Sequence, residues 1–124
     1  MNNRRFLTIL ITLSIFFGWH CGYEKNAPDE IVGTWETSAP QYTDRFITID
    51  TDTITFGIGE GNVEIYTIKK IEKTSVEGSI LYTIYYENGE GVWYKFAFYY
   101  SPENGGEFRR KNQQQIVWQK RSNH

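Results

Sequence analysis

Residues 79–100 read SILYTIYYENGEGVWYKFAFYY, and this stretch carries the pattern that decides the fold. Two runs of β-branched and aromatic residues, 79–87 and 92–100, stand on either side of residues 88–91, which read NGEG. Runs of this kind joined by a short segment rich in Asn and Gly predict a β-hairpin. Both faces of each run carry aromatic side chains, so the outer face either binds something or uses tyrosine for its β-propensity.

The chain on both sides of this hairpin repeats the pattern. Shorter alternating segments, bounded by clusters of Gly, Asn, Asp and Pro, occupy residues 31–37, 44–49, 53–58, 63–72, 107–111 and 115–120. The connections between them are too short for crossover helices, and no segment keeps a 3.6-residue period. The sequence therefore predicts an all-β fold, a small antiparallel meander of about eight strands that is closed or nearly closed into a barrel. Lysines near residue 70 predict that 63–72 is an edge strand.

The N-terminal 22 residues, MNNRRFLTILITLSIFFGWHCG, have the pattern of an export leader. Arg4 and Arg5 precede an apolar run over residues 6–19. A helix of that length rises about 21 Å, short of the roughly 30 Å hydrocarbon core, which favours a signal segment over a stable transmembrane helix. We expect a leader at 1–22, a polar tether at 23–30 and one domain at 31–121.

Cys21 stands directly behind the apolar run. This arrangement resembles a bacterial lipoprotein signal, in which such a cysteine is lipidated and becomes the mature N-terminus. Plain secretion and an uncleaved N-terminal anchor stay open as alternatives. The sequence thus predicts an exported protein of the cell envelope, either a membrane-anchored lipoprotein or a periplasmic or secreted protein.

The composition excludes several classes of function. A net charge of −2 over 124 residues argues against a nucleic-acid partner, and the single basic run, residues 109–111, is typical of an exposed strand. His20 and His124 lie outside the predicted domain, as does Cys21. Catalytic triads, histidine metal centres, zinc–thiolate sites and disulfides are therefore excluded from the domain. We expect no cofactor, no metal and no enzymatic activity.

Carboxylates are the remaining candidates for acid–base chemistry. Asp50 and Asp52 share one face of an extended backbone, and Glu60 and Glu64 follow in the next segment. A carboxylate-dependent hydrolase is accordingly kept as a second alternative. The same residues are also typical of turns and solvated strands. The glycine-rich residues 57–61 predict a turn and not a phosphate loop, because a strand and not a helix follows them.

Residues 31–35 read IVGTW, and a Gly-x-Trp at the start of the first strand of a β meander resembles the signature of lipocalins and related calycins. The whole chain is similar to small lipocalin-like domains of bacteria. The resemblance implies that Trp35 plugs one end of a barrel and that Gly33 lets the chain pass tightly around it. It also implies that a basic residue after the last strand, Lys120 or Arg121, packs over the indole. Barrels of eight short strands have a nearly filled interior, so we expect no large lipid cavity.

Together these features predict a non-enzymatic binding module for a small apolar or aromatic ligand or for a partner protein. The candidate ligand-facing residues are Tyr82, Phe96 and Phe98 if the interior binds, and Tyr85, Trp93 and Tyr99 if the outer face binds. The first alternative is an exported inhibitor or envelope-assembly factor that acts through a strand edge. The sequence makes no prediction of the oligomeric state.

Overall fold

The computed structural model describes residues 20–122, so most of the predicted leader lies outside the described residues. Its strands are β1 His20–Glu24, β2 Gly33–Glu36, β3 Arg45–Ile49, β4 Thr53–Gly59, β5 Asn62–Val76, β6 Ser79–Glu87, β7 Trp93–Ser101, β8 Glu107–Arg110 and β9 Gln113–Lys120. Two short 3-10 turns, η1 Pro40–Tyr42 and η2 Glu103–Gly105, are the helical elements of this part of the chain. No helix within residues 20–122 is both long enough and apolar enough to span a membrane.

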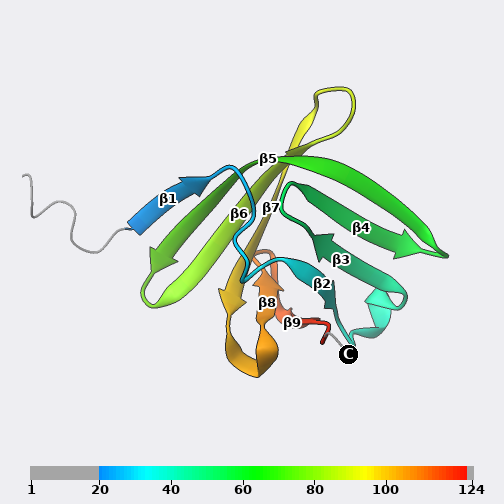
Figure 1. Ribbon diagram of the computed structural model, residues 1–124. Coiled ribbons are helices and arrows are strands. Elements are labelled where there is room, and N and C mark those ends of the chain that lie inside the picture. The colour runs from blue at the N-terminus through cyan, green and yellow to red at the C-terminus, as the bar shows by residue number, and fades with distance from the viewer. Residues whose placement is uncertain (1–19, 123–124) are drawn as a thin grey trace, which may run out of the picture.

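Strands β2 to β9 form a closed eight-stranded antiparallel barrel, and each pairs with its neighbours in the chain (Figure 1). The seam lies between the first and last strands of the barrel, where Trp35 pairs with Lys120 and Glu36 with Gln119. The predicted all-β meander is thus confirmed, and its closure is compatible with a lipocalin-like fold.

Strand β5 is longer than the sequence predicted, and it is not an edge strand. Its first part, residues 62–67, pairs with β4. Its second part, residues 71–75, pairs with β1, while β6 lies along its other side from residue 67 to 76. The lysines near residue 70 therefore stand on the surface of a strand with neighbours on both sides, and the prediction of an edge was wrong.

Residues 23–30, predicted as a tether, are attached to the barrel at two places, although most of their side chains are exposed. Tyr23 and Glu24 belong to β1, in which Tyr23 pairs with Glu72. Ala27 is buried, and its amide donates a hydrogen bond to the Thr51 carbonyl at 2.8 Å. The chain reaches β2 across one end of the barrel without a free linker.

The two ends of the barrel differ in how they are covered. Residues 27–32 cross the end that holds the turns at 50–52 and 102–106, and Ile31 there is fully buried. We call this the closed end. The opposite, open end holds the connections at 37–44, 60–61, 88–92 and 111–112.

The interior is filled from the closed end toward the middle by inward side chains of alternating positions. Its members share near-complete burial: Ile31, Trp35, Ile47, Ile49, Ile54, Ile68, Ile71, Tyr82, Ile84, Phe96, Phe98, Phe108, Ile116 and Trp118, with Ala27 at the margin. Cross-strand aromatic pairs and tight packing of this kind are a major source of barrel stability. The filled interior agrees with the expectation that a barrel of short strands lacks a large lipid cavity.

Candidate functional site

The closed end is organised around Trp35, as the Gly-x-Trp resemblance implied. The Trp35 indole is fully buried, and its Nε1 donates a hydrogen bond to the Ile31 carbonyl at 3.0 Å. Lys120 Nζ lies 5.3 Å from the centre of the Trp35 ring and donates to the Glu30 carbonyl at 2.8 Å. Gly33 has φ +148, and a Cβ there would lie 3.1 Å from Cδ of Lys120. The glycine is therefore needed for the close approach of this lysine stem.

Of the two basic residues expected over the indole, Lys120 takes that position. Arg121 instead points outward and makes an ion pair with Glu36. Burial lowers the pKa of Lys120, and the nearby charge of Glu30 partly opposes that shift. Lys120 is therefore half-buried, and its ammonium is stabilised by the Trp35 ring and the Glu30 carbonyl.

The three candidate residues of the interior lie in the filled part of the barrel. Tyr82 and Phe98 are fully buried and Phe96 nearly so. Phe98 contacts Tyr82 and Phe96 at ring distances of 5.7 and 5.5 Å, and Phe108 at 4.5 Å. These rings form core, and they leave no room for a ligand among themselves.

The three candidate residues of the outer face are not brought together. Tyr85 and Tyr99 are half-buried on the outside of β6 and β7, with the Thr83–Ala97 pair between their rows. Tyr85 lies beneath Lys70 Nζ at 4.7 Å. Trp93 begins β7 opposite Glu87 and is 53% exposed. Tyr85, Trp93 and Tyr99 therefore stand apart from one another and do not form one aromatic patch.

An apolar pocket of about 270 Å³ opens at the open end of the barrel, and we call it the mouth pocket. Its wall includes aromatic rings from six elements together with two arginines and one carboxylate. The lining residues are Tyr42, Arg45, Phe46, Ile47, Phe56, Gly57, Ile58, Glu64, Tyr66, Tyr86, Arg110 and Trp118. The mixture of aromatic walls with a few polar groups is typical of a small-molecule site.

Three tyrosines cluster beside this pocket, and two of them, Tyr66 and Tyr86, line it. Tyr86 lies 4.9 Å from Tyr66 in a tilted arrangement and 5.6 Å from Tyr94 in a stacked one, and Tyr66 lies 5.9 Å from Tyr94, edge to face. Phe56 completes the group at 5.6 Å from Tyr86. Burial raises the pKa of both Tyr66 and Tyr86, and tyrosine hydroxyls are neutral donors near pH 7 with or without that shift.

The connection between β2 and β3 covers the other side of the pocket. Its 3-10 turn η1 places Tyr42 against Trp118, with 5.4 Å between ring centres. The Tyr42 hydroxyl donates to Oε1 of Gln113 at 2.7 Å, which fixes the turn to β9. A short connection thus supplies one wall of the site.

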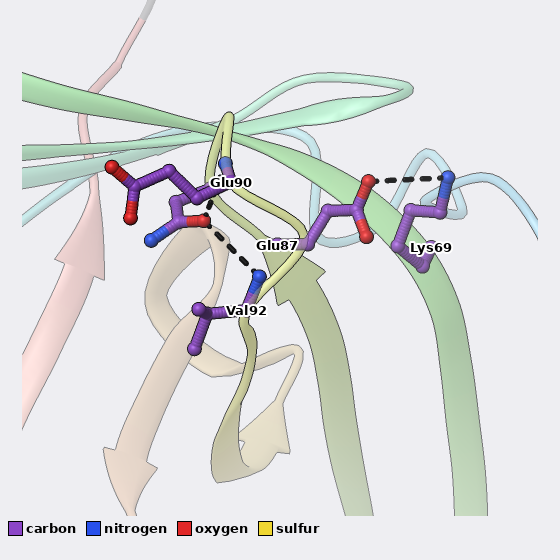
Figure 2. Close-up of polar contacts among 5 residues, drawn as sticks. Lys69, Glu87, Glu90 and Val92 are labelled. Carbon is purple, nitrogen blue, oxygen red and sulfur yellow. Dashed lines mark hydrogen bonds and ion pairs between the residues drawn. The ribbon is translucent and has the colours of Figure 1, made fainter.

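The β6–β7 loop at the rim is held by its own polar contacts (Figure 2). The Asn88 side-chain carbonyl accepts hydrogen bonds from the amides of Glu90 and Val92 at 2.8 and 3.2 Å. Lys69 Nζ lies 3.7 Å from a carboxylate oxygen of Glu87 at the base of the loop. These contacts set where β7 begins and therefore where Tyr94 stands beside the pocket.

A larger hollow of about 490 Å³ lies on the outer face of β5, β6 and β7. Its wall is mainly polar: Glu72, Thr74, Thr83, Lys95, Lys111 and Asn112 line it beside Leu81, Tyr85, Phe96, Ala97 and Arg110. Apolar burial is the main source of affinity for a small ligand, so the smaller mouth pocket is the better candidate site.

The mouth pocket was not predicted from the sequence, although part of it has a sequence signal. Tyr86 and Tyr94 share the inward faces of Tyr82 and Phe98, so extending those faces to the strand ends finds both. The sequence predicts Arg110 as part of an exposed basic run. It is half-buried on the inward side of β8, while its neighbour Arg109 is exposed. Because residues 109–111 are all basic, the sequence does not show which of them faces inward and which faces outward.

The four carboxylates of the hydrolase hypothesis are not brought together. Asp50 and Asp52 lie in the turn before β4 at the closed end, whereas Glu60 and Glu64 follow β4 at the open end. Among residues 20–122 no three His, Cys, Asp or Glu side chains gather as metal ligands would.

The comparisons with known proteins add no family to this geometry. Neither protein-family models, nor curated proteins, nor solved structures give a match to the chain.

Proposed function

We propose that this protein is a non-enzymatic binding module that takes a small apolar or aromatic ligand into the mouth pocket of a lipocalin-like barrel. The observation that carries the proposal is the group of Tyr66, Tyr86 and Phe56, three half-buried aromatic rings that line the mouth pocket. Rings at these separations offer a further ring both stacking and edge-to-face contacts.

The size of the pocket limits the ligand. Its volume of about 270 Å³ is close to the lower limit of sites for drug-sized molecules, roughly 300 Å³. The buried rings of Phe98 and Phe108 fill the barrel beneath it. A compound of one or two rings fits this space better than a long acyl chain.

We further propose that the protein is exported and held at a membrane surface by a lipid on Cys21. The charged and apolar pattern of residues 1–22 supports the proposal. Cys21 itself lies in β1, where its backbone pairs with that of Thr74 in β5. A lipid at that position would hold the barrel against the membrane with almost no slack. A Cys21→Ala variant should move from the membrane to the soluble fraction, and unchanged fractionation would refute the lipid anchor.

The ligand proposal is tested with a neutral two-ring compound, 2-naphthamide. The full chain in lipid nanodiscs is titrated while the indole Nε1–H signals of ¹⁵N-tryptophan-labelled protein are recorded. We expect a saturable change at Trp118 in the mouth pocket and no change at Trp35, whose indole donates to Ile31 at the closed end. No saturable change at Trp118 would end the ligand proposal. Native mass spectrometry of protein from its own envelope would then look for a copurifying partner.

A second candidate function is interaction through a strand edge, as in an inhibitor or envelope-assembly factor. The observation that favours it is β1, which among the described strands pairs with β5 alone. A partner strand could extend the sheet at this edge. Hydrogen exchange tests the idea, because β1 amides should be better protected in envelope preparations than in the purified protein. Equal protection in both would argue against it.

A further inference from the structure

Trp118 has a buried hydrogen-bond donor without an acceptor. Its side chain is 2% exposed, it forms part of the wall of the mouth pocket, and its Nε1 has no hydrogen-bond partner among the described residues. The contrast with Trp35 is direct, because that equally buried indole donates to the Ile31 carbonyl. Buried indole N–H groups are ordinarily paired. Because the Nε1 atom of Trp118 is closed to solvent, the indole marks the wall of the pocket but is not itself assigned a ligand atom.

Arg110 is the second unmatched donor in the same pocket. It is half-buried on the inward side of β8, and its guanidinium carbon lies 5.2 Å from the centre of the Phe96 ring. The ion pairs of the described residues all involve other cations, so no carboxylate lies within 4 Å of this guanidinium. A guanidinium held against a ring, away from carboxylates, keeps its donors available for an oxyanion.

The charges around the pocket favour an anion. Arg45 and Arg110 line it against the single carboxylate of Glu64. Glu64 is exposed and lies next to Tyr66, whereas Arg110 is half-buried against the Phe96 ring and lines the outer hollow as well as the mouth pocket. The Arg110 charge therefore has less access to water than the Glu64 charge, and its interaction with a ligand is less screened.

We infer that the mouth pocket takes an aromatic carboxylate, with the ring beside Tyr66 and Tyr86 and the carboxylate oxygens accepting hydrogen bonds from Arg110. The inference rests on the proposed function and names its ligand class. A carboxylate suits this donor, because it offers two oxygens in the plane that a guanidinium fork recognises. A neutral ring of the same shape would leave the arginine unmatched.

The test compares 2-naphthoate with its neutral analogue 2-naphthamide on the full chain in lipid nanodiscs. We expect naphthoate to bind at least about tenfold more tightly, which is the scale of one charge-assisted hydrogen bond. Naphthoate should also shift the signal of the Trp118 indole, which forms part of the pocket wall, and leave that of Trp35 unchanged. A Trp118→Phe variant assigns the signal.

Two matched variants locate the effect. Arg110→Gln should reduce naphthoate affinity to that of naphthamide, while Arg109→Gln removes the same charge from the outer side of β8 and should leave the preference intact. Arg110→Lys retains the charge but loses the fork, and should give an intermediate affinity. The Trp35 indole signal, unchanged in each variant, shows that the barrel has folded.

The outcomes separate the inference from the proposed function. Equal affinity for the two compounds would overturn the carboxylate inference and leave the aromatic site standing. An equal loss in the Arg109→Gln and Arg110→Gln variants would also overturn it, because the preference would then come from net charge. A Trp118 signal that does not move with naphthoate would remove the indole from the site. Saturable binding of neither compound would end both proposals.

Discussion

Both ends of the barrel carry aromatic rings on the inward faces of their strands, but the two ends differ in whether the polar groups beside these rings have partners. At the closed end the Trp35 indole N–H is paired with Ile31, and the Lys120 ammonium with Glu30. At the open end the Trp118 indole N–H has no partner and Arg110 no carboxylate within 4 Å among the described residues. The indoles and the cations therefore differ between the two ends, although the closed end also holds one buried hydroxyl without a partner, that of Tyr82.

The difference also separates stability from function along one axis of the molecule. Groups with hydrogen-bond partners stabilise the native state, whereas a buried donor without one costs stability. We expect the closed end to dominate the free energy of unfolding and the open end to dominate the affinity for a ligand.

Trp35→Ala should have the largest effect of any change at the closed end. It removes a fully buried indole that touches Phe108 at 4.8 Å and Tyr100 at 6.4 Å between ring centres. We expect a loss of about 3–5 kcal/mol in the free energy of unfolding, measured by urea denaturation. Trp93→Ala, an exposed rim residue, is the control and should cost under about 1 kcal/mol. Equal costs would mean that the closed end is not the stabilising end.

Lys120→Met should cost about 1–2 kcal/mol, because it keeps the apolar stem beside Gly33 but loses the bond to the Glu30 carbonyl and the charge over Trp35. The neighbouring Arg121→Met is the control. Its ion pair with Glu36 is exposed, so the cost should be under about 1 kcal/mol. Thermal unfolding of both variants decides the point, and a larger loss for Arg121→Met would contradict the placement of Lys120.

Tyr82→Phe and Tyr86→Phe compare the two ends through alkaline pH. Burial raises the pKa of both hydroxyls above 10.0. At Tyr82 the Glu30 carboxylate raises the pKa further, although the two groups are not hydrogen-bonded. At Tyr86 the positive charge of Arg110 partly opposes the rise. A raised pKa means that the folded state retains a proton that the unfolded state loses. Stability is therefore complete below pH 10 and falls as the pH rises above it.

Both phenylalanine variants should lose less stability than the wild type between about pH 9 and about pH 11, with the larger gain for Tyr82→Phe. At neutral pH the Tyr82→Phe change should be within about 1 kcal/mol of neutral, because the removed hydroxyl is buried without a partner. Urea denaturation across this pH range makes the measurement. A larger gain for Tyr86→Phe would reverse the ranking of burial at the two ends.

The smallest effect is expected at the turns. Glu60 and Glu77 each precede a glycine in a two-residue hairpin turn, with φ of 56° and 51°. Asn adopts this left-handed conformation at lower cost, so Glu60→Asn and Glu77→Asn should each stabilise by about 0.5 kcal/mol. The first turn lies at the open end and the second at the closed end. Similar gains in melting temperature for the two variants would mean that the turns at the two ends are equivalent. The ends would then differ in stability because of their interior side chains and not because of their turns.

The fold was predictable because its signals are local. Alternating runs bounded by clusters of Gly, Asn, Asp and Pro identify the barrel strands, and the meander follows from connections too short for a crossover. Strand β6 begins and ends as the sequence predicted, at Ser79 and Glu87. Strand β1 was not predicted, because its pairing with β5 joins residues about fifty positions apart and leaves no local pattern.

The candidate site was harder to predict for a physical reason. Tyr82 and Phe98 carry the same alternation as Tyr86 and Tyr94, and the sequence does not say at which depth a filled barrel becomes an open pocket. That depth is set by residues 27–32 crossing one end only. The orientation of Arg110 likewise depends on its register with Phe98 across β7 and β8, which composition does not reveal.

The seam between β2 and β9 has a consequence for the order of folding. Elsewhere in the wall, consecutive strands meet through hairpins, but the seam joins Glu36 to Arg121, which are 85 residues apart. Loop closure over such a distance is slow compared with hairpin formation. During synthesis or translocation the sheet should thus assemble as an open ribbon. It can close into a barrel only after β9 has emerged and paired with β2, so this pairing completes the fold.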